Sequence, residues 1–224
     1  MTALAPSDSI AAQLTEAVHD HRILPGMKLS EDEVGEIFDV GRTVARQALQ
    51  TLAHSGLVTI ERNRGAYVAQ PSIKEAREVF EARTLLEPRT ARAAATRATP
   101  KDIKVLQAHI VREHDALAAG HLGQALRLSG QFHLEIARIA DQATVEAFIR
   151  QLIARSSLVI ALYWRRRNAT CESHAHNALI AALESHDEDV AEDLMKGHLL
   201  DLFSQLDLSP RDSQSRSLHE ALAR

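Results

Sequence analysis

The 224-residue sequence is poor in the residues that mark disulfide-rich, aromatic or membrane-bound proteins. It has one cysteine, nine glycines, six prolines and 4% aromatic residues. The single cysteine, Cys171, excludes an internal disulfide framework and is typical of a reducing compartment. No apolar run approaches the roughly 20 residues that a membrane span requires, and the N-terminus shows no signal-peptide pattern. The sequence therefore predicts a helix-rich globular protein of the cytoplasm.

The formal net charge of −4 argues against unspecific coating of nucleic acids, so the distribution of charge matters more than its sum. Residues 1–40 carry eight acidic residues against two basic ones, whereas residues 41–70 carry four arginines against one glutamate. A DNA contact by one such segment would be weak and salt-sensitive. The charge pattern therefore favours a dimer on a palindromic site.

The boundary between these two segments falls within a predicted helix-turn-helix. We expect a helix over residues 31–38, a tight turn over residues 39–41, and a second helix from Arg42 onward. Arg42, Thr43 and Arg46 occupy the first turns of this second helix, where they can contact bases in the major groove. Its predicted apolar stripe consists of Val44, Ala48, Leu49 and Leu52.

A basic hairpin follows this helix. Residues 57–60 and 66–69 are predicted strands, and residues 62–65 are the turn between them. Arg62, Arg64 and Gly65 are candidate contacts to the DNA backbone or minor groove, since glycine permits a close approach. The alternative is a small helical domain with an ordinary hairpin and solvated arginines.

These motifs resemble the winged-helix domain of the GntR family of bacterial transcription regulators. The matching residues are Leu24-Pro25-Gly26-Met27-Lys28-Leu29, Arg42-Thr43-x-x-Arg46-x-Ala48-Leu49, Leu52, Gly56-Leu57-Val58 and Gly65-x-x-Val68. The resemblance implies operator DNA as the partner. Gly41, Val44 and Gln47 depart from the family pattern of Ser, Pro and Glu, which affects capping and base preference but keeps both arginines.

The rest of the chain is predicted to be helical. Residues 7–22 form a first helix, and a linker at residues 70–72 ends an N-terminal domain of residues 1–72. Residues 73–208 are expected to form an all-α antiparallel bundle, followed by a flexible tail of residues 209–224. The bundle's expected helices are 73–98, 99–119, 123–140, 144–167, 172–185 and 187–206. The fold class is mostly α, a winged helix-turn-helix followed by a helical bundle.

Three histidines lie on or beside apolar faces of the predicted bundle. His176 and His198 are each ten to twelve residues from the turn near residue 187, so an antiparallel hairpin brings them to the same height. His133 lies next to the apolar stripe of its own helix. Three inward imidazoles can hold a divalent ion such as zinc. The alternative is that each is a hydrogen-bonded core residue.

Residues 73–206 resemble the FCD effector domain of the FadR-type GntR subfamily, in its six-helix, VanR-like version. The matching motifs are Phe132-His133, His176 with Ala182-Leu183, and Met195-x-x-His198-Leu199. The resemblance implies dimerisation, and it implies that His133, His176 and His198 bind zinc or nickel beside a pocket for a small organic acid. Ser129 occupies the family's Asp ligand position and is a poor metal ligand. The histidines therefore either hold a metal with water, or act directly on an anion.

Arg83 is the candidate partner of an effector carboxylate, because the family often has an inward arginine there. The alternative for Arg83 is an exposed pair with Glu87, four residues on.

Two functions follow from these observations. The first is a ligand-responsive transcription regulator, a dimeric repressor whose operator affinity depends on a small organic acid. The second is a metal-dependent hydrolase or lyase with an accessory DNA-binding head. The sequence has no HExxH motif and no nucleophile–base arrangement near the histidines, so it favours the regulator and predicts no catalytic residue.

Overall fold

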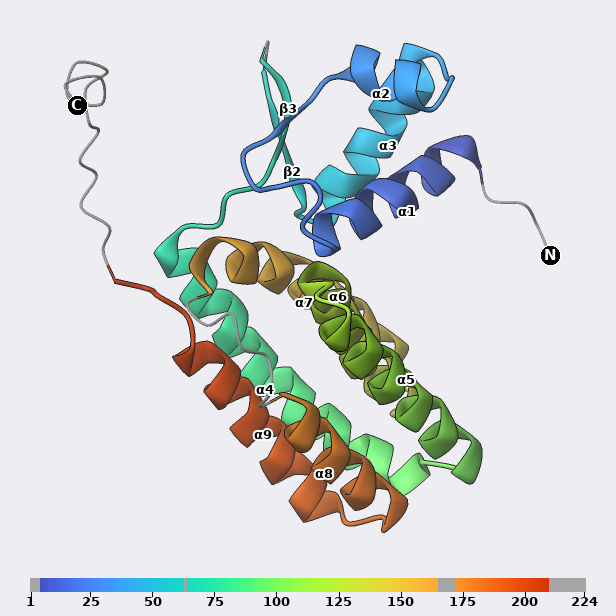
Figure 1. Cartoon of the computed structure of the whole chain (residues 1–224), viewed down its shortest axis with the longest axis vertical. Coiled ribbons are helices and arrows are strands. Elements are labelled where there is room, and N and C mark those ends of the chain that lie inside the picture. The colour runs from blue at the N-terminus through green and yellow to red at the C-terminus, as the bar shows by residue number, and fades with distance from the viewer. Residues whose placement is uncertain (1–4, 63, 165–171, 210–224) are drawn as a thin grey trace.

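The computed structural model describes residues 5–62, 64–164 and 172–209. Figure 1 shows a winged-helix unit (residues 5–70) at one end of the long axis and a helical unit (residues 73–208) at the other. No helix in the described part of the chain is both long and apolar enough to cross a bilayer. The predicted fold class is confirmed, with a small three-stranded sheet beside the N-terminal helices.

The winged-helix unit is built around a helix-turn-helix. The side chain of Ser30 accepts a hydrogen bond from the Asp32 backbone and caps the first of its two helices. The second helix buries Ala45, Ala48 and Leu49 against the rest of the unit. The elements in order are α1 (Pro6–His19), β1 (Lys28–Leu29), α2 (Glu31–Ile37), α3 (Arg42–His54), β2 (Val58–Glu61) and β3 (Gly65–Val68).

The sheet has the order β1-β3-β2 and is antiparallel throughout. The hairpin of β2 and β3 matches the predicted wing within one residue at each end. Strand β1 was not predicted, because its two residues are too few to show an alternating pattern. It pairs with β3 through Lys28 and Leu29 and so fastens the wing to the loop after α1.

The helical unit begins where Ser72 and Glu75 form a capping box, and a second box of Thr99 and Asp102 starts the next helix. Pro88 lies inside the first helix, which continues past it. The helix predicted over residues 144–167 has its predicted end outside the described residues, and so does the predicted tail beyond Pro210. The helices are α4 (Ile73–Arg97), α5 (Pro100–Ala118), α6 (Leu122–Ile139), α7 (Ala143–Tyr163), α8 (Glu172–Glu184) and α9 (Glu188–Ser204).

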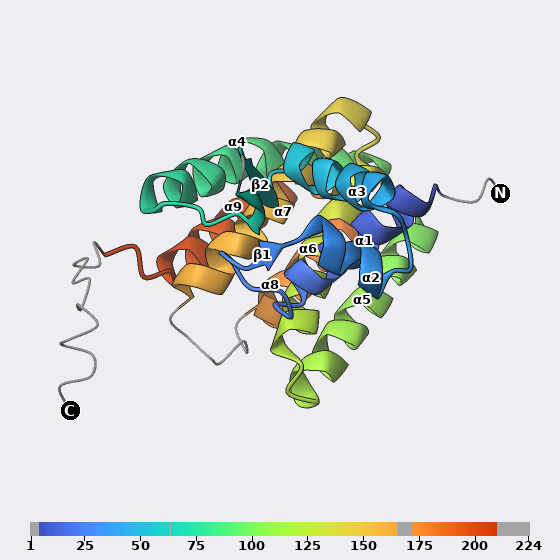
Figure 2. The same cartoon turned by 90° about the horizontal axis from the view of Figure 1, so that it is seen from above.

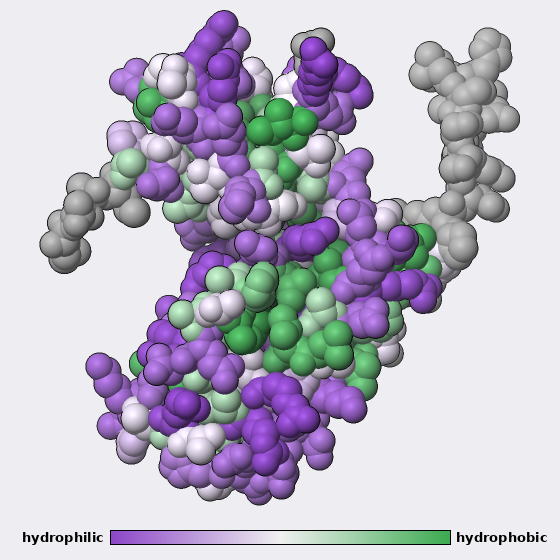
Figure 3. Space-filling model, turned by 180° about the vertical axis from the view of Figure 1, so that it is seen from behind, coloured by the Kyte–Doolittle hydropathy of each residue, from purple (hydrophilic) through white to green (hydrophobic). Residues whose placement is uncertain are grey.

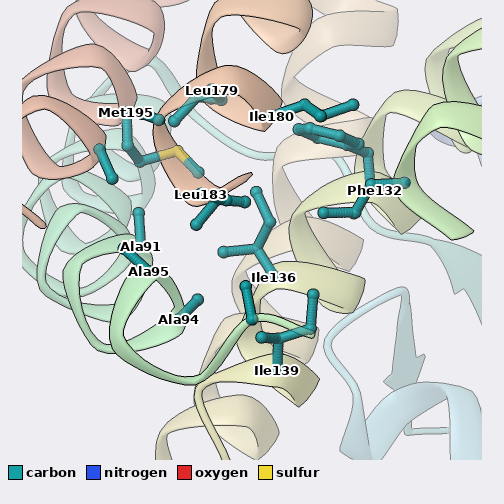
Figure 4. Close-up of a cluster of buried hydrophobic side chains, with 14 of the residues drawn as sticks. Ala91, Ala94, Ala95, Phe132, Ile136, Ile139, Leu179, Ile180, Leu183 and Met195 are labelled. Atoms are coloured by element: carbon teal, nitrogen blue, oxygen red, sulfur yellow. The ribbon is translucent and has the colours of Figure 1, made fainter. Parts of the chain in front are cut away.

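The main core of the helical unit lies between α4, α5, α6, α8 and α9. Figure 4 shows Phe132 and Ile136 of α6 gathered with Leu183 of α8, Met195 of α9 and the small side chains of α4. The small residues let the helices approach closely, and each large side chain is almost fully buried. This packing fixes α6, α8 and α9, the three helices that carry the candidate histidines.

The two units share part of a core. Ala154 and Leu158 of α7 are buried in the same cluster as Leu14 and Val18 of α1. Figures 1 and 2 show α1 lying against the upper ends of α6 and α7, while α3 lies on the far side of α1. The winged-helix unit is therefore packed on the helical unit through α1.

Candidate functional site

The first candidate site is the exposed end of the winged-helix unit. The side chains of Arg42, Thr43 and Arg46 are exposed at the start of α3, and those of Arg62 and Arg64 are exposed at the wing. Figure 1 shows the start of α3 and the tip of the hairpin both pointing away from the helical unit. A duplex can therefore reach both elements without meeting the helical bundle.

The two helix arginines are exposed but paired. Arg46 donates from Nε and Nη2 to the two carboxylate oxygens of Glu31, at 2.8 Å each, and this pair raises the pKa of Arg46. Arg42 pairs with Asp32 in the same way. Both partners belong to α2, so the acidic and basic stretches that are separate in the sequence meet in the structure. The concentration of positive charge expected on α3 is therefore partly neutralised within the free protein.

The wing shows the same pattern on a smaller scale. Arg64 forms an ion pair with Glu61 at 2.6 Å, and its guanidinium lies 5.9 Å from the centre of the Tyr67 ring. Gly65 has φ +102°, a backbone conformation that favours glycine. The wing is therefore held in a shape that presents Arg64 at its exposed edge.

The second candidate site is a buried cluster of the three predicted histidines. His133 of α6, His176 of α8 and His198 of α9 are 3%, 0% and 5% exposed. Their ring nitrogens offer one donor atom each within 4.8 Å of one another. Burial lowers the pKa of all three, that of His176 to about 3, so each ring is neutral near pH 7. Neutral imidazole is the form that binds a metal ion.

Arg83 and Glu87 of α4 lie next to this cluster, and Glu87 contacts His133. Arg83 donates to Glu87 at 2.6 Å and to Ser156 at 3.2 Å, and all three side chains are buried. The alternative of an exposed Arg83–Glu87 pair is therefore right about the pair and wrong about its exposure, because the pair faces the core. Burial alone would raise the pKa of Glu87, but Arg83 and His133 outweigh it and hold that pKa near 2.

Glu87 also determines which ring nitrogen of His133 carries the proton. The Oε2 atom of Glu87 lies 2.6 Å from Nδ1 of His133. An ionised carboxylate only accepts hydrogen bonds, so Nδ1 must carry the proton and Nε2 keeps its lone pair. Nε2 of His133 faces Nε2 of His198 at 3.2 Å. This carboxylate–histidine arrangement is the one that orients metal-binding histidines.

His176 is left without hydrogen bonds. Nδ1 of His176 lies 3.3 Å from Glu113, but neither ring nitrogen makes a hydrogen bond to any described group. The Phe132 ring stacks on His176 at 4.3 Å between ring centres. Burial raises the pKa of Glu113 to about 7. A buried ring with two unpaired nitrogens is costly, and a bound ion would remove part of that cost.

The donor set fits a borderline divalent ion. Nitrogens bound to tetrahedral zinc lie about 3.4 Å apart. The separation of His133 and His198 is already close to this at 3.2 Å, whereas the wider separations in the cluster, which reach no more than 4.8 Å, must contract. Ser129 is buried one turn before His133, at the position of the family's Asp ligand, and it offers a hydroxyl in place of a carboxylate. Three imidazoles would hold the ion and leave a position for water or ligand.

A cavity of about 50 Å³ adjoins the cluster on one side. Arg83, Ser129 and His133 line it, whereas His176 and His198 do not, so the cluster meets the cavity only through His133. His19 and His21 of the winged-helix unit also line it. The cavity is small against the roughly 300 Å³ and above of typical ligand sites. It suits an ion or an acid of a few heavy atoms.

Sequence reasoning found the three histidines, Ser129 and Arg83, and the structure brings all five together. It missed Glu87 and Glu113, which back His133 and His176. Both carboxylates lie on helix faces whose other buried residues are mostly apolar, which is the signal that could have found them. His19 and His21 were also missed, because nothing near the end of α1 indicates a contact with a distant helix.

Comparison with known proteins assigns both units. The pattern described as "Bacterial regulatory proteins, gntR family" matches residues 6–68, and that of the FCD domain matches residues 78–201. The chain is 26% identical over 182 residues to the Nta operon transcriptional regulator of Aminobacter aminovorans, covering 81% of this chain and 85% of that one. It is 29% identical over 181 residues to the transcriptional repressor RspR of Escherichia coli, covering 80% and 79%. The fold matches that of Escherichia coli McbR/YncC with a TM-score of 0.82 at 18% identity, covering 90% and 97%.

These relatives are regulators and not enzymes, which argues against the hydrolase or lyase alternative. The geometry agrees, because Glu87 and Glu113 contact imidazole nitrogens and neither lines the cavity. The chain belongs to the GntR family of bacterial transcription regulators, in the FadR subfamily that carries an FCD domain.

Proposed function

We propose that this regulator is a dimeric repressor that binds a palindromic operator and changes its affinity when a small organic acid enters the helical unit. Residues 1–72 are the DNA-binding domain, residues 73–208 bind effector and dimerise, and the protein acts in the cytoplasm on DNA. The observation that carries the proposal is that one chain has both an exposed arginine surface on one unit and a buried, neutral three-histidine cluster in the other.

The exposed surface supports a specific mode of DNA binding. Arg42, Thr43 and Arg46 enter the major groove at the start of α3, while Arg62, Arg64 and Gly65 approach the backbone or minor groove. To contact bases, Arg46 exchanges its bond to Glu31 for a bond to guanine. A bidentate contact to guanine replaces the two hydrogen bonds that Arg46 gives up.

The buried cluster supports a metal-assisted effector site. His133, His176 and His198 would hold zinc or nickel, and the ion would supply a positive charge for an acid carboxylate. Ser129 is placed to donate a hydrogen bond to the acid from the cavity wall. Arg83 contributes its charge at a distance, because its guanidinium is already bound to Glu87 and Ser156.

An apolar face of the helical unit supports the dimer. Leu85 of α4 and Leu200 of α9 are 70% and 50% exposed and line one groove. Figure 3 shows apolar residues gathered on one face of the helical unit, next to the winged-helix unit. Arg77 and Glu81 of α4 line the same apolar groove as Leu85. Two copies related by a twofold axis can place Arg77 of each against Glu81 of the other.

Binding of the protein to the DNA upstream of its own gene tests the proposal. Gel shifts are run with zinc-loaded protein, with and without C2–C4 hydroxy and dicarboxylic acids. We expect a complex with two protomers per site and a change in affinity with at least one acid. Absence of a specific complex at any zinc or acid concentration contradicts the proposed function.

The metal content of His176→Ala tests the cluster. We expect wild-type protein to hold about one zinc per chain after dialysis, and the variant to hold much less, since one of three ligands is lost. His114→Ala, which changes a histidine outside the cluster, is the matched control. Equal zinc in wild type and His176→Ala contradicts the ligand role.

A further inference from the structure

The cavity beside the histidine cluster has walls from two different units. Ser129 and His133 of α6 and Ser156 of α7 line it together with His19 and His21. Residues 19–21 are the end of α1 and the turn that follows it, so they belong to the winged-helix unit. A molecule in this cavity therefore lies against the DNA-binding unit as well as against the effector site.

The turn at residues 20–21 is fastened tightly to α6. Arg127 donates from Nε to the carboxylate of Asp20 at 2.7 Å, and both side chains are largely buried. Gly123 of α6 packs on the same turn, and a Cβ added there would lie 1.8 Å from the Asp20 carbonyl oxygen. Only glycine at this position allows the observed contact. The position of His19 and His21 in the cavity wall is thus determined by α6.

Both histidines bring an unpaired polar atom to this junction. The Nε2 atoms of His19 and His21 are buried and have no hydrogen-bond partner among the described residues. Burial lowers the pKa of His19 to about 4, so its ring is neutral near pH 7. A neutral ring nitrogen either donates or accepts according to its tautomer, which suits a hydroxyl or a second carboxylate.

We propose that the effector is a small carboxylic acid with a second polar group, and that His19 and His21 of the winged-helix unit bind this second group. The inference rests on the proposed function and adds its mechanism. The acid's first carboxylate lies at the His133 end of the cavity, and its second group hydrogen-bonds Nε2 of His19 or His21. The effector thereby bridges the two units and adds a contact to those that hold the turn after α1 against α6, which restricts the placement of α3 in a dimer.

Direct contact with the winged-helix unit is tested on zinc-loaded, full-length protein with four probes: lactate, glycolate, malonate and malate. Binding is measured by calorimetry, and hydrogen exchange is followed over residues 17–23. We expect at least one probe to bind and to slow exchange in residues 17–23 as well as in α6. Slowed exchange confined to the helical unit overturns the proposal, and so does a failure of all four probes to bind.

Two variants sharpen the test. His19→Leu keeps the bulk of the side chain but removes Nε2, and we expect about a fivefold loss of probe affinity with unchanged zinc affinity. Gly123→Ala displaces the turn at Asp20, and we expect the probe to lose its effect on residues 17–23. Gly197→Ala is the matched control, because nothing lies within 4 Å of its added methyl group. Wild-type probe affinity in His19→Leu, together with wild-type protection of residues 17–23 in Gly123→Ala, overturns the proposal.

Operator binding in the same preparations separates this inference from the proposed function. If wild-type protein binds its operator and responds to a probe that residues 17–23 do not sense, the bridging inference is wrong and the regulator stands. If a probe protects residues 17–23 but no operator complex forms, the cavity assignment holds and the proposed function is wrong.

Discussion

The two units use the same kind of ion pair in opposite surroundings. Arg46 and Glu31 pair on the surface of the winged-helix unit, where the arginine side chain is 60% exposed. Arg83 and Glu87 pair inside the helical unit, where the side chains are 3% and 2% exposed. Water competes for the first pair, so it contributes little to stability and can be exchanged for a base. The second pair is inaccessible to water, so it fixes the geometry of His133.

The largest expected effect is on the buried pair. Glu87→Gln removes a charge from the core and leaves the Arg83 guanidinium without a counter-charge, which should lower the free energy of unfolding by about 3 to 5 kcal/mol. Denaturant unfolding of metal-free protein measures this. Glu146→Gln is the control, because Glu146 pairs with Arg150 on the surface. A loss no larger than that of the control would remove the contrast between the two pairs.

The exposed pair should show the reverse behaviour. Arg46→Ala should weaken specific operator binding by about tenfold or more, because a bidentate base contact is lost, while the melting temperature stays close to that of wild type. Fluorescence anisotropy with operator DNA and calorimetry give the two numbers. Arg150→Ala removes an equally exposed arginine from the helical unit and should bind like wild type. Normal operator binding by Arg46→Ala would displace α3 as the recognition helix.

The pH dependence of stability separates buried from exposed groups at the junction. The folded-state pKa of His19 is about 4, below its ordinary value of 6.5. Between pH 4 and pH 6.5, His19 is therefore protonated in the unfolded chain and neutral in the folded chain. Stability from this source is fully present above pH 6.5 and is lost as the pH falls toward 4. At pH 5 the loss should be about 1 to 2 kcal/mol. Parallel pH profiles for wild type and His19→Leu would contradict the burial of this ring.

The smallest expected effect concerns the acidic partners of the recognition helix. Glu31→Gln should raise operator affinity by less than about fivefold, because it frees Arg46 from an exposed pair. The same change should raise affinity for nonspecific DNA at least as much, which lowers specificity. Anisotropy titrations with operator and with scrambled DNA measure both. A weaker complex with Glu31→Gln would indicate that the pair positions Arg46 for the base.

The sequence predicted the elements well wherever a pattern is local. The apolar stripe of α3, the wing and the six bundle helices each show a period of their own, and their ends fall within a few residues of those observed. The height of His176 and His198 followed from counting residues along an antiparallel hairpin. These features need no knowledge of distant parts of the chain.

The sequence could not predict contacts that depend on how helices turn toward one another. Glu87 reaches His133 from α4, and Glu113 approaches His176 from α5, at separations of 46 residues or more along the chain. The pairing of Arg46 with Glu31 also depends on the angle between α2 and α3. In the same way, Gly123 gave no signal until the structure placed the Asp20 backbone against it.

The central claim is that filling the buried histidine cluster changes what the exposed arginines do. Operator affinity is measured with and without zinc and a bound acid, in wild-type protein and in His176→Ala. We predict about a 5- to 150-fold change in wild type, the usual range of coupling between two sites, and little change in the variant. Equal responses in the two proteins, or no response in wild type, would contradict the account.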